Sequence, residues 1–208
     1  MTTKYIFIII SCVLVTFSAR AQAAVPPYAF FKGEGVFLSA SDFTAGKISY
    51  ANDQFNKRYK IKLHELINTS TIKIVIGDSA ISLKKDSIFG YRTKKNVWYR
   101  FYNNVTYKII NPGENILLYS KTYLSGVPKN SHFVTSFFFS ENANATIHLL
   151  SKKNLKIILS KDVGFHELLD VYFPNDNQLT EYDPINKIYM LNRIYDLSKR
   201  ALRQLTNN

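Results

Sequence analysis

Between residues 35 and 140, apolar positions recur with the two-residue period that is typical of half-exposed β-strands. The stretch 58–63 alternates strictly between basic and apolar side chains, and 72–76 repeats the pattern. Further strand signals follow at 35–39, 88–92, 97–102, 106–110, 116–123 and 133–139, and 41–47 reads as a turn. Short loops between short strands predict antiparallel hairpins. They indicate a meandering antiparallel β-sheet, either open or closed into a small barrel.

After residue 150 the apolar positions take up the period of an α-helix. Two short helices are predicted over 152–160 and 163–173, the first of them with Ser151 as its N-cap. The longest helical pattern runs from 188 to 205 and carries a basic opposite face. Strands first and helices last predict an α+β fold with C-terminal helices. We expect a single domain over residues 24–208, β-rich from 35 to 140 and helical from 151 to 206.

The first 23 residues have the pattern of a secretory signal peptide. Lys4 precedes an apolar core at 6–17, which is shorter than the ~20 apolar residues of a membrane span. The segment 21–23 then gives the small-x-small pattern at which such peptides are cleaved. An uncleaved anchor, or a lipidated Cys12, is the alternative, but Cys12 lies in the middle of the apolar core. We therefore expect an exported protein that is periplasmic, outer-membrane-associated or extracellular.

Cleavage after Ala23 would change both the cysteine content and the charge of the chain. Cys12 is the single cysteine, so the mature chain would contain none and could be neither a disulfide scaffold nor a thiol enzyme. Lys4 and Arg20 would also leave, so 25 of the 27 basic residues remain against 15 acidic ones, a net charge of +10. A basic surface suits an anionic polysaccharide, a lipid headgroup or an acidic protein. Nucleic acid is disfavoured by the export signal and by the scattered lysines, and no transmembrane span is expected in the mature chain.

The segment 97–102 supplies the most specific candidate for a binding surface. On a strand, Trp98, Arg100 and Tyr102 share one face, and Val97, Tyr99 and Phe101 share the other. If the second set is core, the first forms an exposed stripe that could stack on sugar rings and pair with anionic groups. The alternative is that both faces are covered, one by the sheet core and one by the C-terminal helices. We favour this alternative because aromatic side chains are more often packed than presented.

Sequence motifs for catalysis or metal binding are weak. His166 and Asp170 lie four residues apart on a predicted helix and could share a metal ion or a proton, but no further ligand accompanies them. The sequence has no nucleophile elbow, phosphate loop, HExxH motif or calcium loop. We therefore assign no catalytic, metal-binding or cofactor-binding residues and expect no cofactor.

Several segments together resemble those of a known group of sequences. They are 35–39 with Asp42 and Phe43, then 85–92, 99–104, 138–140 and 165–170. In this order they resemble a group of uncharacterised secreted proteins from low-GC Gram-negative bacteria. The resemblance implies an exported, single-domain protein and brings no activity, ligand or site residue with it.

Three functional hypotheses follow from the sequence. The first is a non-enzymatic exported binding or envelope-associated protein, supported by the basic charge and the candidate stripe. The second is a hydrolase acting on envelope or environmental polymers, which would need a cleft where acidic or histidine side chains converge. The third is a structural component of the envelope with a protein partner.

Overall fold

The alternating region of the chain forms one open, eight-stranded antiparallel sheet, in the order β11-β10-β9-β8-β7-β6-β1-β2. The computed structural model describes residues 33–52, 57–63, 69–127 and 130–206, so the predicted signal peptide at 1–23 lies outside the described residues. The strands are β1 (Glu34–Phe37), β2 (Ser49–Asn52), β6 (Gly90–Arg92), β7 (Trp98–Tyr102), β8 (Val105–Ile109), β9 (Leu117–Ser125), β10 (His132–Ser140) and β11 (His148–Leu149). The predicted α+β class is confirmed, and of the two sheet forms the open one is observed.

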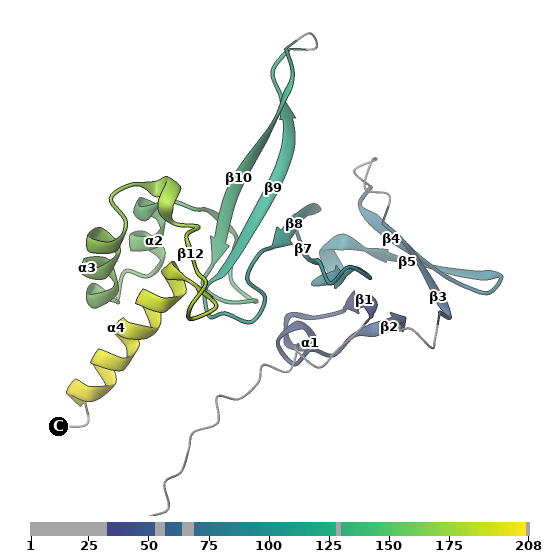
Figure 1. Ribbon diagram of the computed structural model, residues 1–208. Coiled ribbons are helices and arrows are strands. Elements are labelled where there is room, and N and C mark those ends of the chain that lie inside the picture. The colour runs from purple at the N-terminus through teal and green to yellow at the C-terminus, as the bar shows by residue number, and fades with distance from the viewer. Residues whose placement is uncertain (1–32, 53–56, 64–68, 128–129, 207–208) are drawn as a thin grey trace, which may run out of the picture.

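Two smaller sheets and four helices complete the fold (Figure 1). The three-stranded small sheet consists of β3 (Tyr59–Lys62), β4 (Thr71–Ile76) and β5 (Ser79–Lys84), and the other pairs β12 (Tyr182–Asp183) with β13 (Ile188–Tyr189). The helices are α1 (Ala40–Thr44), α2 (Lys152–Ile158), α3 (Val163–Tyr172) and α4 (Met190–Thr206). In the part of the chain that the structure describes, no helix has the length and apolar character needed to cross a bilayer.

The segment 41–47, predicted to be a turn, overlaps the short helix α1, which begins at Ala40. Ser39 caps it by accepting the N–H of Asp42 at 3.0 Å. The cap directs Phe43 into the core, where it lies edge-on to Phe37 at 5.5 Å between ring centres. A single buried aromatic residue gives too little periodicity for a five-residue helix to be recognised from sequence.

A tight turn sets the register in the middle of the large sheet. Asn103 and Asn104 both have positive φ, 50° and 60°, as a two-residue hairpin turn between twisted strands requires. The turn pairs Tyr102 with Val105, and therefore Tyr99 with Lys108. Pairing continues on both sides, from Tyr99 to Tyr91 and from Lys108 to Ser120, so these four residues form a row across β6 to β9.

The row across β6 to β9 defines two faces of the sheet. We call the face that carries Tyr91, Tyr99, Lys108 and Ser120 the groove face, and the opposite one the Trp98 face. The groove face is covered at one end by the small sheet and at the other by the helices α2, α3 and α4 (Figure 1). Each is attached by its own apolar cluster. The small sheet packs Ile72 and Ile74 against Val36, Tyr91 and Phe101 of the large sheet. The helices pack Leu155, Leu169 and Leu191 against Leu118 and Phe139.

Asp162 links the helices to one another. Its carboxylate caps α3 by accepting the N–H of Phe165, and it also accepts the hydroxyl of Ser198 and pairs with Lys199 on α4, each at 3.0 Å. Burial alone would raise the pKa of this carboxyl. The hydrogen bonds from Lys199, Phe165 and Ser198 outweigh burial, so the pKa of Asp162 is lowered.

Replacing Asp162 should therefore destabilise the protein in a pH-dependent way. We expect Asp162→Asn to lower the free energy of unfolding by about 1–3 kcal/mol at neutral pH. Because the folded pKa is depressed, the stabilisation is present above the unfolded pKa of ~3.9 and is lost as the pH falls through the folded value. Urea unfolding at several pH values measures this. The difference in unfolding free energy between the variant and the unmodified protein should shrink in acid. The control is Asp78→Asn, which removes an exposed carboxylate and should cause no comparable loss of stability. A constant difference across pH would contradict this role of Asp162.

Candidate functional site

Trp98, Arg100 and Tyr102 do not form an exposed stripe on β7. Trp98 and Arg100 are 4% and 5% exposed, and Tyr102 is half-buried. Trp98 stacks on Phe37 at 5.3 Å and lies edge-on to Phe43 at 5.7 Å, so α1 and its neighbours cover this face. Both faces of β7 are covered, as in the favoured alternative, but the Trp98 face is covered by α1 rather than by the C-terminal helices.

Arg100 holds together a buried polar cluster. Its Nη1 donates to the Tyr119 hydroxyl at 2.8 Å and to Ser140 Oγ at 3.2 Å, and its Nη2 donates to the Ala145 carbonyl at 2.8 Å. Burial raises the pKa of Tyr119, and the nearby Arg100 charge partly offsets this. The guanidinium therefore joins β7 to β9, β10 and the following loop, and its role is structural.

Arg92 is a second buried arginine on the same face, and its environment is different. It is 1% exposed, and its Nε donates to the Gly33 carbonyl at 2.8 Å. The guanidinium carbon lies 5.1 Å from the centre of the Trp98 ring, yet neither Nη atom has a hydrogen-bond partner among the described residues. Burial lowers the pKa of Arg92. Its charge is therefore desolvated without full compensation.

His166 and Asp170, the other candidate pair, are engaged with other groups. His166 Nε2 lies 3.0 Å from the Leu159 carbonyl, whereas Asp170 forms ion pairs with Lys152 at 3.1 Å and Lys156 at 2.5 Å. Hydrogen bonds from Lys156 and Lys152 lower the pKa of Asp170. Asp170 thus fastens α3 to α2. Nowhere in the described chain do three His, Cys, Asp or Glu side chains gather as a metal site would need.

The groove face contains two adjoining cavities, of about 420 and 440 Å³. Leu63, Tyr91 and Tyr99 line both cavities, and we call the combined space the groove. The rings of Tyr91 and Tyr99 stack at 4.8 Å with an angle of 8° between planes. Phe101 extends this row at 5.6 Å from Tyr91, and the three rings form the floor of the groove. Tyr99 is half-buried, whereas Tyr91 and Phe101 are 2% and 5% exposed.

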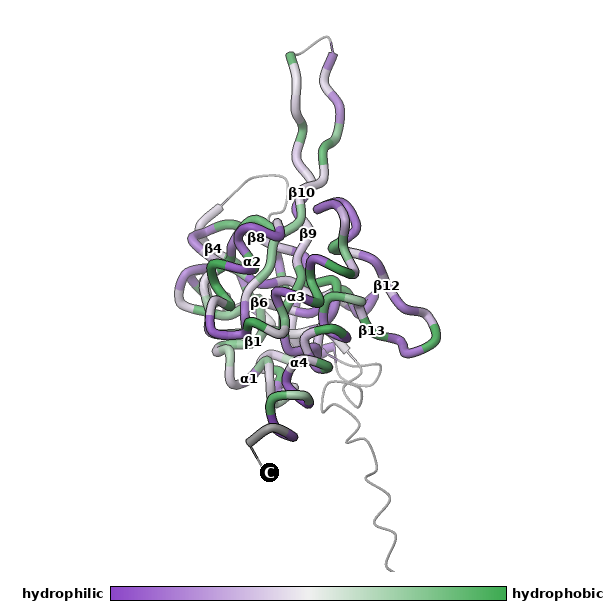
Figure 2. The backbone as a smooth tube through the Cα atoms, turned by 90° about the vertical axis from the view of Figure 1, so that its left-hand side faces the viewer, coloured by the Kyte–Doolittle hydropathy of each residue, from purple (hydrophilic) through white to green (hydrophobic). Residues whose placement is uncertain are grey.

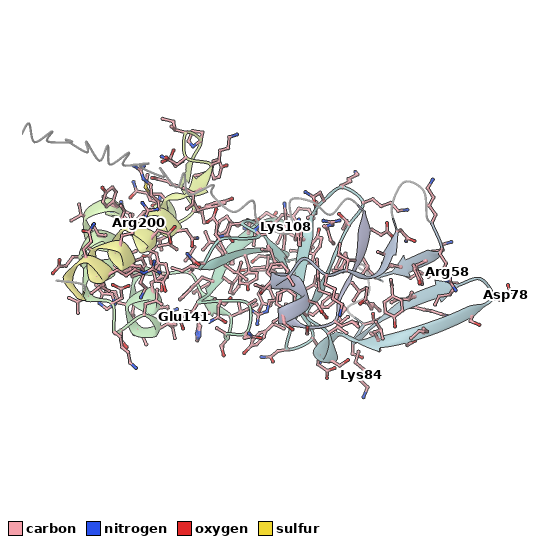
Figure 3. All side chains as sticks on the ribbon, turned by 90° about the horizontal axis from the view of Figure 1, so that it is seen from below. Arg58, Asp78, Lys84, Lys108, Glu141 and Arg200 are labelled. Atoms are coloured by element: carbon pink, nitrogen blue, oxygen red, sulfur yellow. The ribbon has the colours of Figure 1, made fainter. Side chains whose placement is uncertain are left out.

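Lysine side chains supply the charge of the first cavity. Lys85, in the 3₁₀ turn after β5, is 4% exposed, and its ammonium lies 5.5 Å from the Phe101 ring centre. Burial lowers the pKa of Lys85, and no carboxylate among the described residues pairs with it. Lys108 is exposed and lies between the C-terminal helices and the small sheet (Figure 3). Lys121 also lines the cavity, but its ammonium lies over Tyr107 at 5.9 Å, on the Trp98 face.

The second cavity contributes a carboxylate that is already paired. Glu34 lines this cavity together with Lys94 and Lys95, and its carboxylate lies 3.4 Å from the Lys94 ammonium. Among the described lining residues of both cavities, Glu34 is the single acid, and there is no histidine. The groove therefore presents hydroxyl groups and cations beside aromatic rings, and Glu34 is the one carboxylate among its described lining residues.

The stripe considered from the sequence lies on the Trp98 face of β7, whereas the groove lies on the opposite face. Phe101 is buried in the core, Tyr99 is half-buried and lines the groove, and Lys85 and Tyr91 were not singled out from the sequence as site residues. The strand register is the sequence feature that could have identified the groove residues, because the turn at Asn103 and Asn104 places Lys108 beside Tyr99. A solvated lysine directly opposite Tyr99 indicates that this part of the face is open.

Comparisons with protein-family models, with curated proteins and with solved structures gave no match to this chain. Its candidate site therefore has to be interpreted from its own geometry.

Removing the charge of Arg100 and of Arg92 should change the stability of the protein by different amounts. Arg100→Met leaves the Ala145 carbonyl without its donor and should cost about 1–3 kcal/mol of unfolding free energy. Arg92→Met removes an incompletely paired buried cation and keeps contact with Trp98, so it should change stability by less than about 1 kcal/mol or increase it. Urea unfolding of both variants gives the comparison. An equal or larger loss for Arg92→Met would refute it.

Proposed function

We propose that this chain is an exported, non-enzymatic binding protein whose groove takes a segment of an anionic polysaccharide. The observation that carries the proposal is Lys85, a nearly buried cation that lies beside the aromatic floor of the groove and pairs with no carboxylate in the described part of the chain. A desolvated cation without a counter-ion gains most from an anionic ligand, because the ligand supplies the missing charge in a place of low dielectric.

The other lining groups suit a saccharide ligand. The half-buried ring of Tyr99 offers apolar surface for the C–H face of a sugar ring. The hydroxyls of Thr106 and Ser120, on the same face, can exchange hydrogen bonds with sugar hydroxyls. Lys108 adds a second, solvated cation beside Tyr99, so carboxylates on successive sugar units would meet positive charge.

The whole-chain charge supports the same ligand class. The formal net charge is +12, and the predicted mature chain would retain +10. A charge of this size attracts polyanions over the Debye length of ~10 Å at 0.1 M salt, and the attraction weakens as salt rises. Export, which the N-terminal pattern predicts, would bring the protein to the polysaccharides of the cell envelope and its surroundings.

The alternative of a polymer hydrolase is less well supported by the groove. Cleavage of a glycosidic bond usually requires two carboxyl groups on opposite sides of the bond. The described lining residues supply Glu34, which is paired with Lys94. The other candidate groups, His166 and Asp170, belong to the helical part and are bound to neighbouring residues there. We therefore propose binding without turnover.

Calorimetric titration with polygalacturonate, a polymer of uronic acids, tests the proposal. We expect salt-dependent binding, no binding of neutral dextran, and a loss of about tenfold in affinity for Lys85→Gln and for Lys108→Gln. Lys85→Gln should not lower the melting temperature, because the ammonium is already desolvated in the free protein. A reduced affinity with undiminished stability separates a binding role from a structural one.

The matched control is Lys153→Gln, which removes one charge from an exposed lysine on α2, away from the groove. It should bind polygalacturonate like the unmodified protein. Equal affinity of all three variants would show that the attraction comes from net charge alone, and equal binding of dextran would show that no anionic group is recognised. Either result would refute the proposed site.

A further inference from the structure

The β9–β10 hairpin projects from the body of the protein and exposes apolar side chains (Figures 1 and 2). Leu124 and Phe133, which lie opposite each other near its end, are 60% and 78% exposed. On the other face of the hairpin Tyr123 lies opposite Val134 and is 43% exposed. A two-stranded ribbon of this kind is only marginally stable by itself in water. It therefore needs a partner that covers it.

The outer edge of β10 is open along this projecting part. β11 pairs with β10 only at Phe138 and Phe139, and the last bond on that side runs from the Leu150 N–H to the Phe137 carbonyl at 2.9 Å. The backbone groups of every second residue of a strand face the same side. The N–H and C=O groups of Thr135 and Phe133 therefore face outward, where the described chain provides no strand.

β10 also lacks the features by which proteins usually protect an edge strand. Its nine residues, HFVTSFFFS, include no Lys, Arg, Asp, Glu, Pro or Gly, and the two strands pair without a register shift. Charged residues, proline and bulges are the common means of preventing strand addition. An uncharged, regular edge of this kind favours addition of a further strand.

We propose that the added strand is β10 of a second copy of this chain, paired antiparallel about a twofold axis through Val134. In this register Phe133 lies opposite the partner's Thr135, and Val134 lies opposite the partner's Val134. The outward backbone groups of Phe133 and Thr135 in each copy then form hydrogen bonds with the partner. Phe137 takes no part in this pairing, because its carbonyl already accepts a hydrogen bond from the Leu150 N–H. The axis thus follows from which backbone groups are open.

The chemistry of the edge fits a pairing of identical strands. Directly opposed residues share a face, so Phe133 packs against a β-branched threonine and Val134 against another valine, which are favourable cross-strand pairs. No charged side chain meets its own copy, as would happen at a lysine-bearing edge. Antiparallel pairing also directs the bases of the two hairpins in opposite directions, which separates the two basic bodies (Figure 1).

A lipid bilayer would satisfy the exposed side chains less well than a second copy does. Unpaired backbone groups are strongly unfavourable in hydrocarbon, and both Phe133 and Thr135 would carry such groups into it. Pairing with a second copy removes them. The inference is independent of the ligand proposed for the groove.

Sedimentation velocity over a range of concentrations tests the pairing, with proline placed on one edge or the other. Thr135→Pro removes an outward N–H from β10 and should raise the dimer dissociation constant at least about tenfold. The control is Thr122→Pro. Thr122 is the direct partner of Thr135, and the two hydroxyls bond to each other at 2.8 Å, so either variant loses that bond.

The backbone groups of Thr122 face the opposite edge of the hairpin, on the β9 side. The carbonyl of Leu118 faces away from β10 and accepts the Ile110 N–H next to β8, and Thr122, four residues later, faces the same side. Thr122→Pro should therefore dimerise like the unmodified protein. Equal weakening by both proline variants would show that hairpin stability, rather than the β10 edge, controls association, and would overturn the proposal.

A cysteine at the proposed axis gives a second test that does not depend on proline. In a Cys12→Ser background Val134→Cys becomes the single cysteine of the chain, and mild oxidation should yield a disulfide-linked dimer. Tyr123→Cys, on the neighbouring strand directly opposite Val134, should give no disulfide-linked dimer under the same conditions.

Monomeric protein at all concentrations, with no cross-linking at residue 134, would overturn the inference. Flotation of that monomer with vesicles of anionic phospholipid, lost in Phe133→Ser, would then assign the hairpin to a membrane surface.

Discussion

Burial of both faces of β7 is the constraint on which the rest of the structure depends. β7 carries Trp98 on one face and Phe101 on the other, so each face needs cover, and three separate apolar clusters provide it. On one side α1 packs its single buried phenylalanine beside Trp98. On the other side the small sheet and the C-terminal helices attach at opposite ends and leave Tyr99 and Lys108 between them. The groove is therefore the part of this face that neither attachment covers.

Much of the fold could be predicted from the sequence because its elements depend on local patterns. The alternation at 58–63 and 72–76 becomes β3 and β4, and the spacings after residue 150 become α2, α3 and α4, with Ser151 as the predicted cap of α2. Whether the sheet closes into a barrel depends on contact between its first and last strands, which no local pattern records. The small helix α1 contributes one buried residue and was read as a turn.

The candidate site was less predictable for a related reason. Alternation along β7 separates Trp98, Arg100 and Tyr102 from Tyr99 and Phe101, but it does not say which set meets solvent. That outcome depends on α1 and the small sheet, which are distant in sequence. The burial of Lys85 and Arg92 was equally unpredictable from local sequence. Both are basic residues, and both are buried by elements that are distant in sequence. A basic residue in a sequence is normally taken as solvated, so these two gave no signal.

The separate attachment of the small sheet has a consequence for the motions of the protein. Its cluster with Val36 and Phe101 is distinct from the cores under α1 and under the helices. Local opening of a cooperative unit costs less than global unfolding when few contacts cross its boundary. The small sheet can therefore separate from the groove face while the helical end stays folded. Amide exchange in β4 would then report the free energy of widening the groove, independently of the stability of the chain as a whole.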